Sequence, residues 1–108
     1  MTASAATTPS RVASSPAHTV RAVETEFHIA LSRTKVAAGR YTVTAVNKGT
    51  VEHGLVINGP GVHDKLIGVV KPGHSASKAV TLRKGRYDIF CPISNHKMSG
   101  MNTHLTVR

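Results

Sequence analysis

The chain has 108 residues, enough for one small domain built around a single core. Fourteen Lys and Arg against five Asp and Glu give a formal net charge of +9 at pH 7 with His neutral. The single Cys excludes an internal disulfide, a Cys-rich zinc module and an iron–sulfur cluster. The apolar runs are far shorter than the roughly 18 residues of a membrane-spanning helix.

The first 17 residues differ in composition from the rest of the chain. They are nearly all Ala, Ser, Thr and Pro, with one Arg and no apolar periodicity. Such a segment buries too little surface to order itself, so we expect residues 1–17 to be a disordered tail or linker. It lacks the charged start and apolar stretch of a signal peptide. By composition alone it is either a plain tail or the linker left after an export signal is removed.

From His18 onward the chain alternates apolar and polar residues, with turn signals at 38–39, 47–49, 58–61, 71–73 and 84–85. Short strands separated by turns at this spacing predict an all-β sandwich or barrel. Residues 62–72 fit a short helical turn or an edge strand. The predicted strand faces are Phe27, Ile29 and Leu31; Tyr41, Val43 and Ala45; His53, Leu55 and Ile57; Tyr87, Ile89 and Cys91; and Met101, Thr103, Leu105 and Val107.

The positive charge does not by itself indicate nucleic-acid binding. The basic residues are spread singly along the chain, and the densest group, Arg83-Lys84-Gly85-Arg86, resembles a turn. Four aromatic residues in all leave little for base stacking. We therefore expect a basic surface and no nucleic-acid partner.

Four side chains with metal-binding atoms fall where strands begin or end. Cys91 ends one predicted strand, His96 follows five residues later, and Met101 opens the last strand after five more. His53 lies far upstream on the apolar face of its own strand. A thiolate, two imidazoles and a weak axial thioether form the ligand set of a type 1, blue-copper electron-transfer site. The pattern therefore predicts a copper site at one end of the sandwich.

Three segments in the same order carry a resemblance to the cupredoxins, the family that includes plastocyanin, azurin and rusticyanin. Residues 47–53 resemble the family's Asn-x-Gly-x-x-x-His run, and residues 85–91 its Gly-x-Tyr-x-x-x-Cys strand. Residues 91–101 resemble its ligand loop, with four residues between Cys91 and His96 and four between His96 and Met101. This spacing is similar to that of rusticyanin. The resemblance covers about Phe27 to Arg108 and implies a single Greek-key β-sandwich over residues 18–108.

The chain departs from the family pattern beside two of the ligands. Gly54 follows His53 where many members have Asn, and Pro92 follows Cys91 where many have Ser or Thr. Proline has no N–H to donate. Both positions adjoin the hydrogen bonding around the Cys sulfur, which tunes the potential of such sites.

The resemblance implies a function as well as a fold. One copper ion would be held by His53, Cys91, His96 and the weaker Met101, with Met98 a rival thioether, and would cycle between Cu(I) and Cu(II). The chain would be an electron carrier and not an enzyme. Its alternatives are a copper-binding or delivery protein without a redox role, and an excised domain of a larger copper oxidase or reductase.

The resemblance also implies partners and a location. His96 would lie near the surface beside an apolar docking patch of Pro92, Ile93 and Met98. The charge predicts acidic redox partners that bind transiently to a monomer. The protein would be periplasmic or otherwise extracytoplasmic. The tail would then be a linker to a removed signal or to a membrane anchor.

Overall fold

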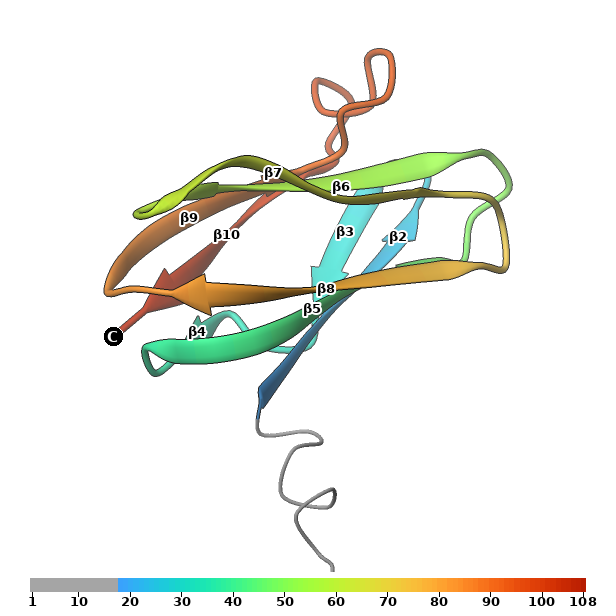
Figure 1. Cartoon of the computed structure of the whole chain (residues 1–108). Helices are drawn as coiled ribbons and strands as arrows, with labels where there is room; N and C mark the ends of the chain where they lie inside the picture. The colour runs from blue at the N-terminus through green and yellow to red at the C-terminus, as the bar shows by residue number, and fades with distance from the viewer. Residues whose placement is uncertain (1–17) are drawn as a thin grey trace, which may run out of the picture.

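The computed structural model describes residues 18–108, and the tail predicted over residues 1–17 lies outside them. The described residues form two β-sheets packed face to face, without an α-helix, which confirms the predicted all-β sandwich (Figure 1). Within this part of the chain no helix is long and apolar enough to cross a membrane. The strands are β2 (Thr19–Thr25), β3 (His28–Leu31), β4 (Lys35–Val36), β5 (Gly39–Asn47), β6 (His53–Gly59), β7 (Val62–Val70), β8 (Ser75–Leu82), β9 (Gly85–Phe90) and β10 (Asn102–Val107).

The sheet topology joins strands that are distant in the sequence. One sheet has the order β4-β10-β9-β6-β7 and the other β3-β2-β5-β8. β6 pairs antiparallel with β9, with Val56 opposite Phe90. The first residue of β6, His53, therefore lies at the same end of the sheet as Cys91, which directly follows β9. The topology thus brings together two predicted ligands that are 38 positions apart in the sequence.

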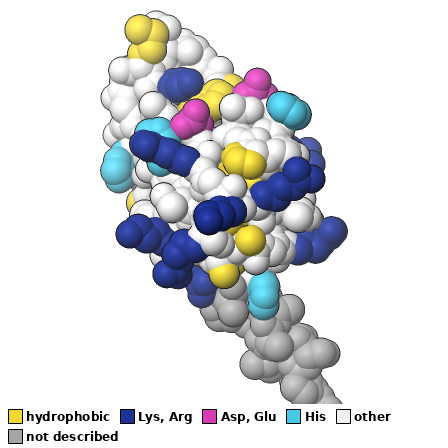
Figure 2. All heavy atoms as spheres, turned by 90° about the vertical axis from the view of Figure 1, so that its left-hand side faces the viewer, with side chains coloured by type: hydrophobic (Ala, Val, Ile, Leu, Met, Phe, Trp, Pro, Cys, Tyr) yellow, Lys and Arg dark blue, Asp and Glu magenta, His cyan; other side chains and the backbone are white. Residues whose placement is uncertain are grey.

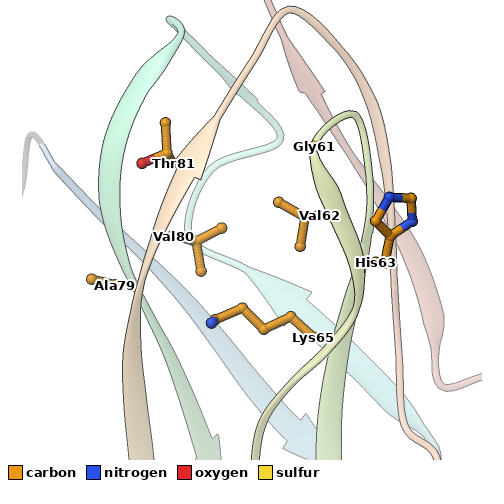
Figure 3. Close-up of a pocket in the computed structure, with 7 residues that line it drawn as sticks. All are labelled: Gly61, Val62, His63, Lys65, Ala79, Val80 and Thr81. Atoms are coloured by element: carbon orange, nitrogen blue, oxygen red, sulfur yellow. The ribbon is translucent and has the colours of Figure 1, made fainter.

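The ambiguous segment at residues 62–72 is a strand. β7 pairs antiparallel with β6 and forms an edge of the five-stranded sheet. A groove of about 330 Å³ opens between β7 and β8. Val62 and Val80 line it, and the Lys65 side chain lies across it (Figure 3).

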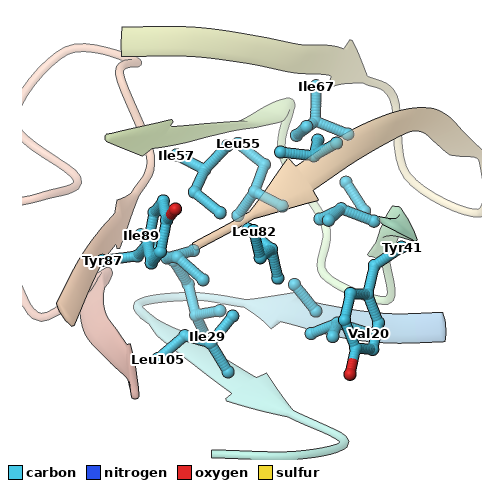
Figure 4. Packing of buried hydrophobic residues seen from close by; sticks show 14 of the residues in the cluster. Val20, Ile29, Tyr41, Leu55, Ile57, Ile67, Leu82, Tyr87, Ile89 and Leu105 are labelled. Atoms are coloured by element: carbon cyan, nitrogen blue, oxygen red, sulfur yellow. The ribbon is translucent and has the colours of Figure 1, made fainter. Parts of the chain in front are cut away.

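The core fills the space between the sheets with aliphatic side chains and two tyrosines (Figure 4). The predicted inward faces of β5 and β9 are buried, as are His53, Leu55 and Ile57 on β6. On the predicted face of β10, Leu105 and Val107 are buried, whereas Thr103 is partly exposed. Phe27 is an exception because β3 begins one residue later, and its side chain is 43% exposed. Its ring lies 5.0 Å from that of His96, at the end of the sandwich where the predicted ligands gather.

Tyr87 is fully buried and ties two turns together at the other end of the sandwich. Its hydroxyl donates to the Pro60 carbonyl oxygen at 2.6 Å and accepts from the Arg83 N–H at 2.9 Å. Gly59 is required beside the ring, since a Cβ there would lie 2.4 Å from a ring carbon. Tyr87 is thus a core residue, as its place in the alternation predicts.

One buried carboxyl group has no partner in the described structure. Glu24, on the inner face of β2, is 0% exposed, and neither of its carboxylate oxygens has a hydrogen bond. Burial raises the pKa of Glu24 from 4.5 to about 8, because the charged form loses its hydration. The side chain is therefore neutral in the folded protein at pH 7.

Glu24 makes stability depend on pH in a defined direction. Between pH 4.5 and about 8 the folded state holds a proton that the unfolded state releases. The free energy of unfolding therefore falls as pH rises through this window, by at most about 1.4 kcal/mol per pH unit. Glu24→Gln should remove this slope. Denaturant unfolding of both metal-free proteins from pH 4 to 9 measures it, and parallel profiles would contradict the assignment.

Candidate metal centre

Three of the four predicted ligands meet at one end of the sandwich. One donor atom from each of His53, Cys91 and His96 lies within 4.8 Å of the other two. His53 begins β6, Cys91 follows β9, and His96 belongs to the loop between β9 and β10. His53 and Cys91 are 0% exposed, and His96 is half-buried. The cluster therefore lies just beneath the surface and reaches it through His96.

Backbone hydrogen bonds fold the loop over residues 91–101 back onto itself. The Cys91 N–H donates to the Met101 carbonyl at 3.1 Å, and the Met101 N–H donates to the His96 carbonyl at 3.0 Å. Met101 is fully buried beside Cys91, whereas Met98 is 89% exposed at the surface of the loop. Gly100 has a φ of +126°, and a Cβ there would lie 2.7 Å from the Phe27 carbonyl oxygen. Of the two thioethers, the loop thus buries that of Met101 and leaves that of Met98 at the surface.

The two ring nitrogens of His53 have different surroundings. Nε2 lies 3.2 Å from the Glu26 carboxylate, while Nδ1 is buried without a hydrogen-bond partner. Because the carboxylate accepts, Nε2 carries the proton and Nδ1 keeps a free lone pair. An unpartnered buried acceptor is costly unless something binds it. His53 Nδ1 is therefore left free to accept a bond from a group that enters the cluster.

Glu26 is held in place by the loop that precedes His53. Its carboxylate accepts from the Thr50 N–H at 2.5 Å, from the Thr50 hydroxyl and from the Val51 N–H at 3.2 Å. The two bonds from Thr50, and after them the hydrogen bond and charge interaction with His53, lower the pKa of Glu26 from 4.5 to about 2, against the opposing effect of burial. Gly49 makes the approach possible, since a Cβ there would lie 2.0 Å from a carboxylate oxygen. Glu26 is thus ionised, and its hydrogen bond with Nε2 fixes the orientation of the His53 ring.

Asn47 explains the first residue of the Asn-x-Gly-x-x-x-His run. Its buried amide donates to the carbonyls of Val51 at 2.8 Å and Val70 at 2.9 Å. Its carbonyl oxygen accepts from the Gly49 N–H at 2.8 Å. Asn47 therefore fixes the loop that presents both Glu26's partners and His53.

The Cys91 sulfur receives backbone hydrogen bonds despite the two departures from the family pattern. The Gly54 N–H points at Sγ at 3.4 Å, and Ile93 supplies a second N–H where Pro92 has none. Burial raises the pKa of the Cys91 thiol, the two N–H groups oppose this, and the nearby Glu24 adds to it. Because a Cys binds metal as the thiolate, a metal held by Cys91 would displace a proton from this group.

His96 contacts both the cluster and the surface. Its Nδ1 lies 3.5 Å from the Cys91 sulfur, and its ring packs against the rings of Phe27 and His53. Of the three residues predicted to form a docking patch, Pro92 and Met98 are exposed beside it. Ile93 is only partly exposed, because it packs against the hydrophobic core.

The other five histidines lie outside the cluster, as expected. All are exposed: His18, His28, His63, His74 and His104. His104 faces Asp88 across the strand pair at 3.0 Å. Sequence reasoning missed Glu26 and Glu24, because a carboxylate 27 positions from His53 has no diagnostic spacing and meets it only through the fold.

Comparison with known proteins gives likenesses in structure alone. No protein-family model and no curated protein matches the chain. A reduced auracyanin from Roseiflexus castenholzii is 24% identical over 84% of this chain and 97% of its own, with a TM-score of 0.63. A reduced amicyanin mutant is 17% identical over 83% of this chain and 82% of its own, with a TM-score of 0.62. A chain of a heme-copper terminal oxidase dimer is 15% identical over 83% of this chain and 63% of its own, with a TM-score of 0.66.

These likenesses place the chain in the cupredoxin fold. Together with the cluster of His53, Cys91 and His96 they are consistent with the cupredoxin resemblance that the sequence motifs indicate. The donor set also fits the expected metal. Thiolate and thioether favour Cu(I), imidazole serves both oxidation states of copper, and the bare Nδ1 of His53 is aligned to bind.

Removing the charge of Glu26 should weaken metal binding. Glu26→Gln loses the ionised acceptor that sets the His53 tautomer, so copper affinity should fall by about 10- to 100-fold. Competition with a chromogenic Cu(I) chelator measures it. Glu52→Gln removes the same charge from an exposed residue next to His53 and serves as the control. Equal affinities in the two variants would show that Glu26 acts only through net charge.

Proposed function

We propose that the protein carries single electrons between redox partners with one copper ion held in a type 1 site. His53 Nδ1, Cys91 Sγ and His96 Nδ1 would be the three strong ligands, and Met101 the weak axial one. The observation that carries the proposal is the buried His53 Nδ1, which has no protein partner and lies in a cluster with a thiol and a second imidazole. A bound copper ion would supply the one-electron change between Cu(I) and Cu(II).

In this function the chain itself holds the donor atoms in fixed positions. Glu26 fixes the His53 ring, Asn47 fixes the loop before it, and the hydrogen bonds of the Cys91–Met101 loop fix the other donors. A geometry set by the protein changes little between oxidation states, so electron exchange requires little rearrangement. The buried thiol and imidazole also keep water from the site.

His96 would be the point of electron exit and entry. It is the most exposed of the three clustered residues, and Pro92 and Met98 beside it offer an apolar contact. Lys48 and Lys97 are exposed at this end and favour a partner with an acidic rim. A small contact of this kind suits a transient redox complex.

The remaining parts of the proposal follow from the same assignment. The protein would act outside the cytoplasm as a monomer and would not be an enzyme. A delivery protein would need an exposed, exchangeable site, whereas two of the three donors here belong to fully buried residues. A domain of a larger oxidase would need further metal centres supplied by other domains.

The visible spectrum tests the proposal. The metal-free protein titrated with Cu(II) should develop an intense blue thiolate-to-copper band, saturating at one copper per chain and bleaching reversibly on one-electron reduction. Cys91→Ser should abolish the band. A faint band that persists in Cys91→Ser would place copper on surface histidines and refute the electron-carrier function.

The two methionines allow a matched test of the axial ligand. Met101→Leu keeps the side-chain volume but removes the buried sulfur, so it should shift the reduction potential and alter the visible spectrum. Met98→Leu removes an exposed sulfur from the same loop and should change neither. Potentiometric titration of both variants measures the reduction potential. A shift in potential confined to Met98→Leu would make Met98 rather than Met101 the axial ligand.

A further inference from the structure

The positive charge is concentrated at the end of the sandwich away from the ligand cluster. Exposed basic side chains, Arg108 among them, gather where strands and turns of both sheets end, and we call five of them the basic pole (Figure 2). β9 runs from this pole at Gly85 toward Cys91, a length of about 20 Å at roughly 3.3 Å per residue. The basic pole consists of Lys35, Arg40, Arg83, Lys84 and Arg86.

The sheet registers bring Lys35 and Arg40 beside the run at residues 83–86. Lys35 and Arg86 both lie opposite Thr106, one on each side of β10. Arg40 lies opposite Thr81, two residues before Arg83. Arg83 packs against the turn at Gly61, where a Cβ would lie 3.0 Å from its Nε. The cluster is therefore fixed by the fold rather than by a flexible run of basic residues.

No acid neutralises the basic pole within the described part of the chain. Of the five acidic residues in the sequence, Glu24, Glu26 and Glu52 lie toward the ligand end, and Asp88 pairs with His104. Asp64, on β7, is not paired with any of the five basic side chains. A surface with this excess of positive charge attracts an extended anionic partner.

The basic pole also lacks apolar anchors. The exposed large hydrophobic side chains of the described residues lie elsewhere: Phe27, Val51 and Met98 at the ligand end, and Leu66 and Val69 on β7. Protein interfaces are usually centred on such anchors. Both tyrosines are buried in the core and the exposed Phe27 lies at the ligand end, so none of these rings is offered to nucleic-acid bases at the basic pole. Binding to a plane of anionic lipid headgroups requires neither apolar anchors nor exposed aromatic rings.

The chain enters the sandwich near the same end. Thr19 lies opposite Thr42, and the His18 ring packs 5.9 Å from that of Tyr41. The 17 residues before His18 contain no Asp or Glu and one Arg. Residues 1–17 therefore contribute no acidic side chain that could offset the charge of the basic pole.

We propose that the basic pole binds the surface of an anionic phospholipid membrane and turns the His96 end away from it. Basic side chains near such a surface are attracted to its negative potential within about a Debye length. Binding through this pole leaves the ligand loop free for a partner in solution or on a facing surface. This orientation follows from the course of β9, which runs from the basic pole toward Cys91 and so separates the pole from the ligand cluster.

Vesicle co-sedimentation of the full chain tests the proposal. The metal-free protein should bind vesicles of equal parts phosphatidylcholine and phosphatidylglycerol at low salt, lose binding at high salt, and not bind phosphatidylcholine alone. Neutralising four charges of the pole should weaken binding by at least about tenfold. The pole variant carries Lys35→Gln, Arg40→Gln, Lys84→Gln and Arg86→Gln.

A second variant with the same net charge separates the pole from charge in general. It should keep at least half of the wild-type binding, and circular dichroism checks that both variants fold. Equal losses in the two variants, or no binding to anionic vesicles by the wild type, would overturn the proposal. The control carries Lys48→Gln, Lys71→Gln, Lys78→Gln and Lys97→Gln.

Hydrogen–deuterium exchange with and without anionic vesicles tests the orientation. Vesicles should slow exchange at residues 37–40 and 83–86 and leave residues 93–100 unchanged. Protection of residues 93–100 instead would place the ligand loop on the membrane. Pole-dependent binding of an acidic protein, with no vesicle binding, would likewise contradict a lipid partner.

Discussion

The candidate metal centre depends on a single hydrogen bond between the His53 imidazole and the Glu26 carboxylate. It fixes the ring, sets which nitrogen carries the proton, and leaves the other nitrogen bare in a buried position. Thr50 and Val51 hold the carboxylate, and Gly49 leaves room for it. Burying this nitrogen without a hydrogen-bond partner costs free energy of folding. A metal ion bound to the nitrogen would offset that cost.

The two-sheet architecture makes this arrangement possible with very little chain. Pairing of β6 with β9 places the start of one strand beside the end of the other, and the β9–β10 loop then adds His96 and Met101. The same antiparallel geometry sends the turns that carry basic residues to the opposite end. Fold, ligand cluster and charge segregation are thus consequences of one strand arrangement.

The sequence predicted the parts of this structure that leave a local signature. Alternation predicted the buried faces of β5, β6 and β9 and most of that of β10. The spacing of Cys91 and His96, taken with the position of His53, predicted three residues that gather. Phe27 could not be placed by pattern, because an apolar residue before a strand is indistinguishable from one inside it. Residues 62–72 stayed ambiguous because β7, at a sheet edge, alternates poorly, with four successive exposed residues. Glu26 and Glu24 depend on contacts between distant segments that no spacing records.

Crystals of the copper-loaded protein, with anomalous data across the copper edge, test the central claim most directly. The account predicts one copper peak per chain, bonded to His53 Nδ1, Cys91 Sγ and His96 Nδ1, with the Met101 sulfur at a longer distance and the Glu26–His53 hydrogen bond intact. A copper peak on exposed histidines such as His63 or His104, with Cys91 unligated, would contradict it.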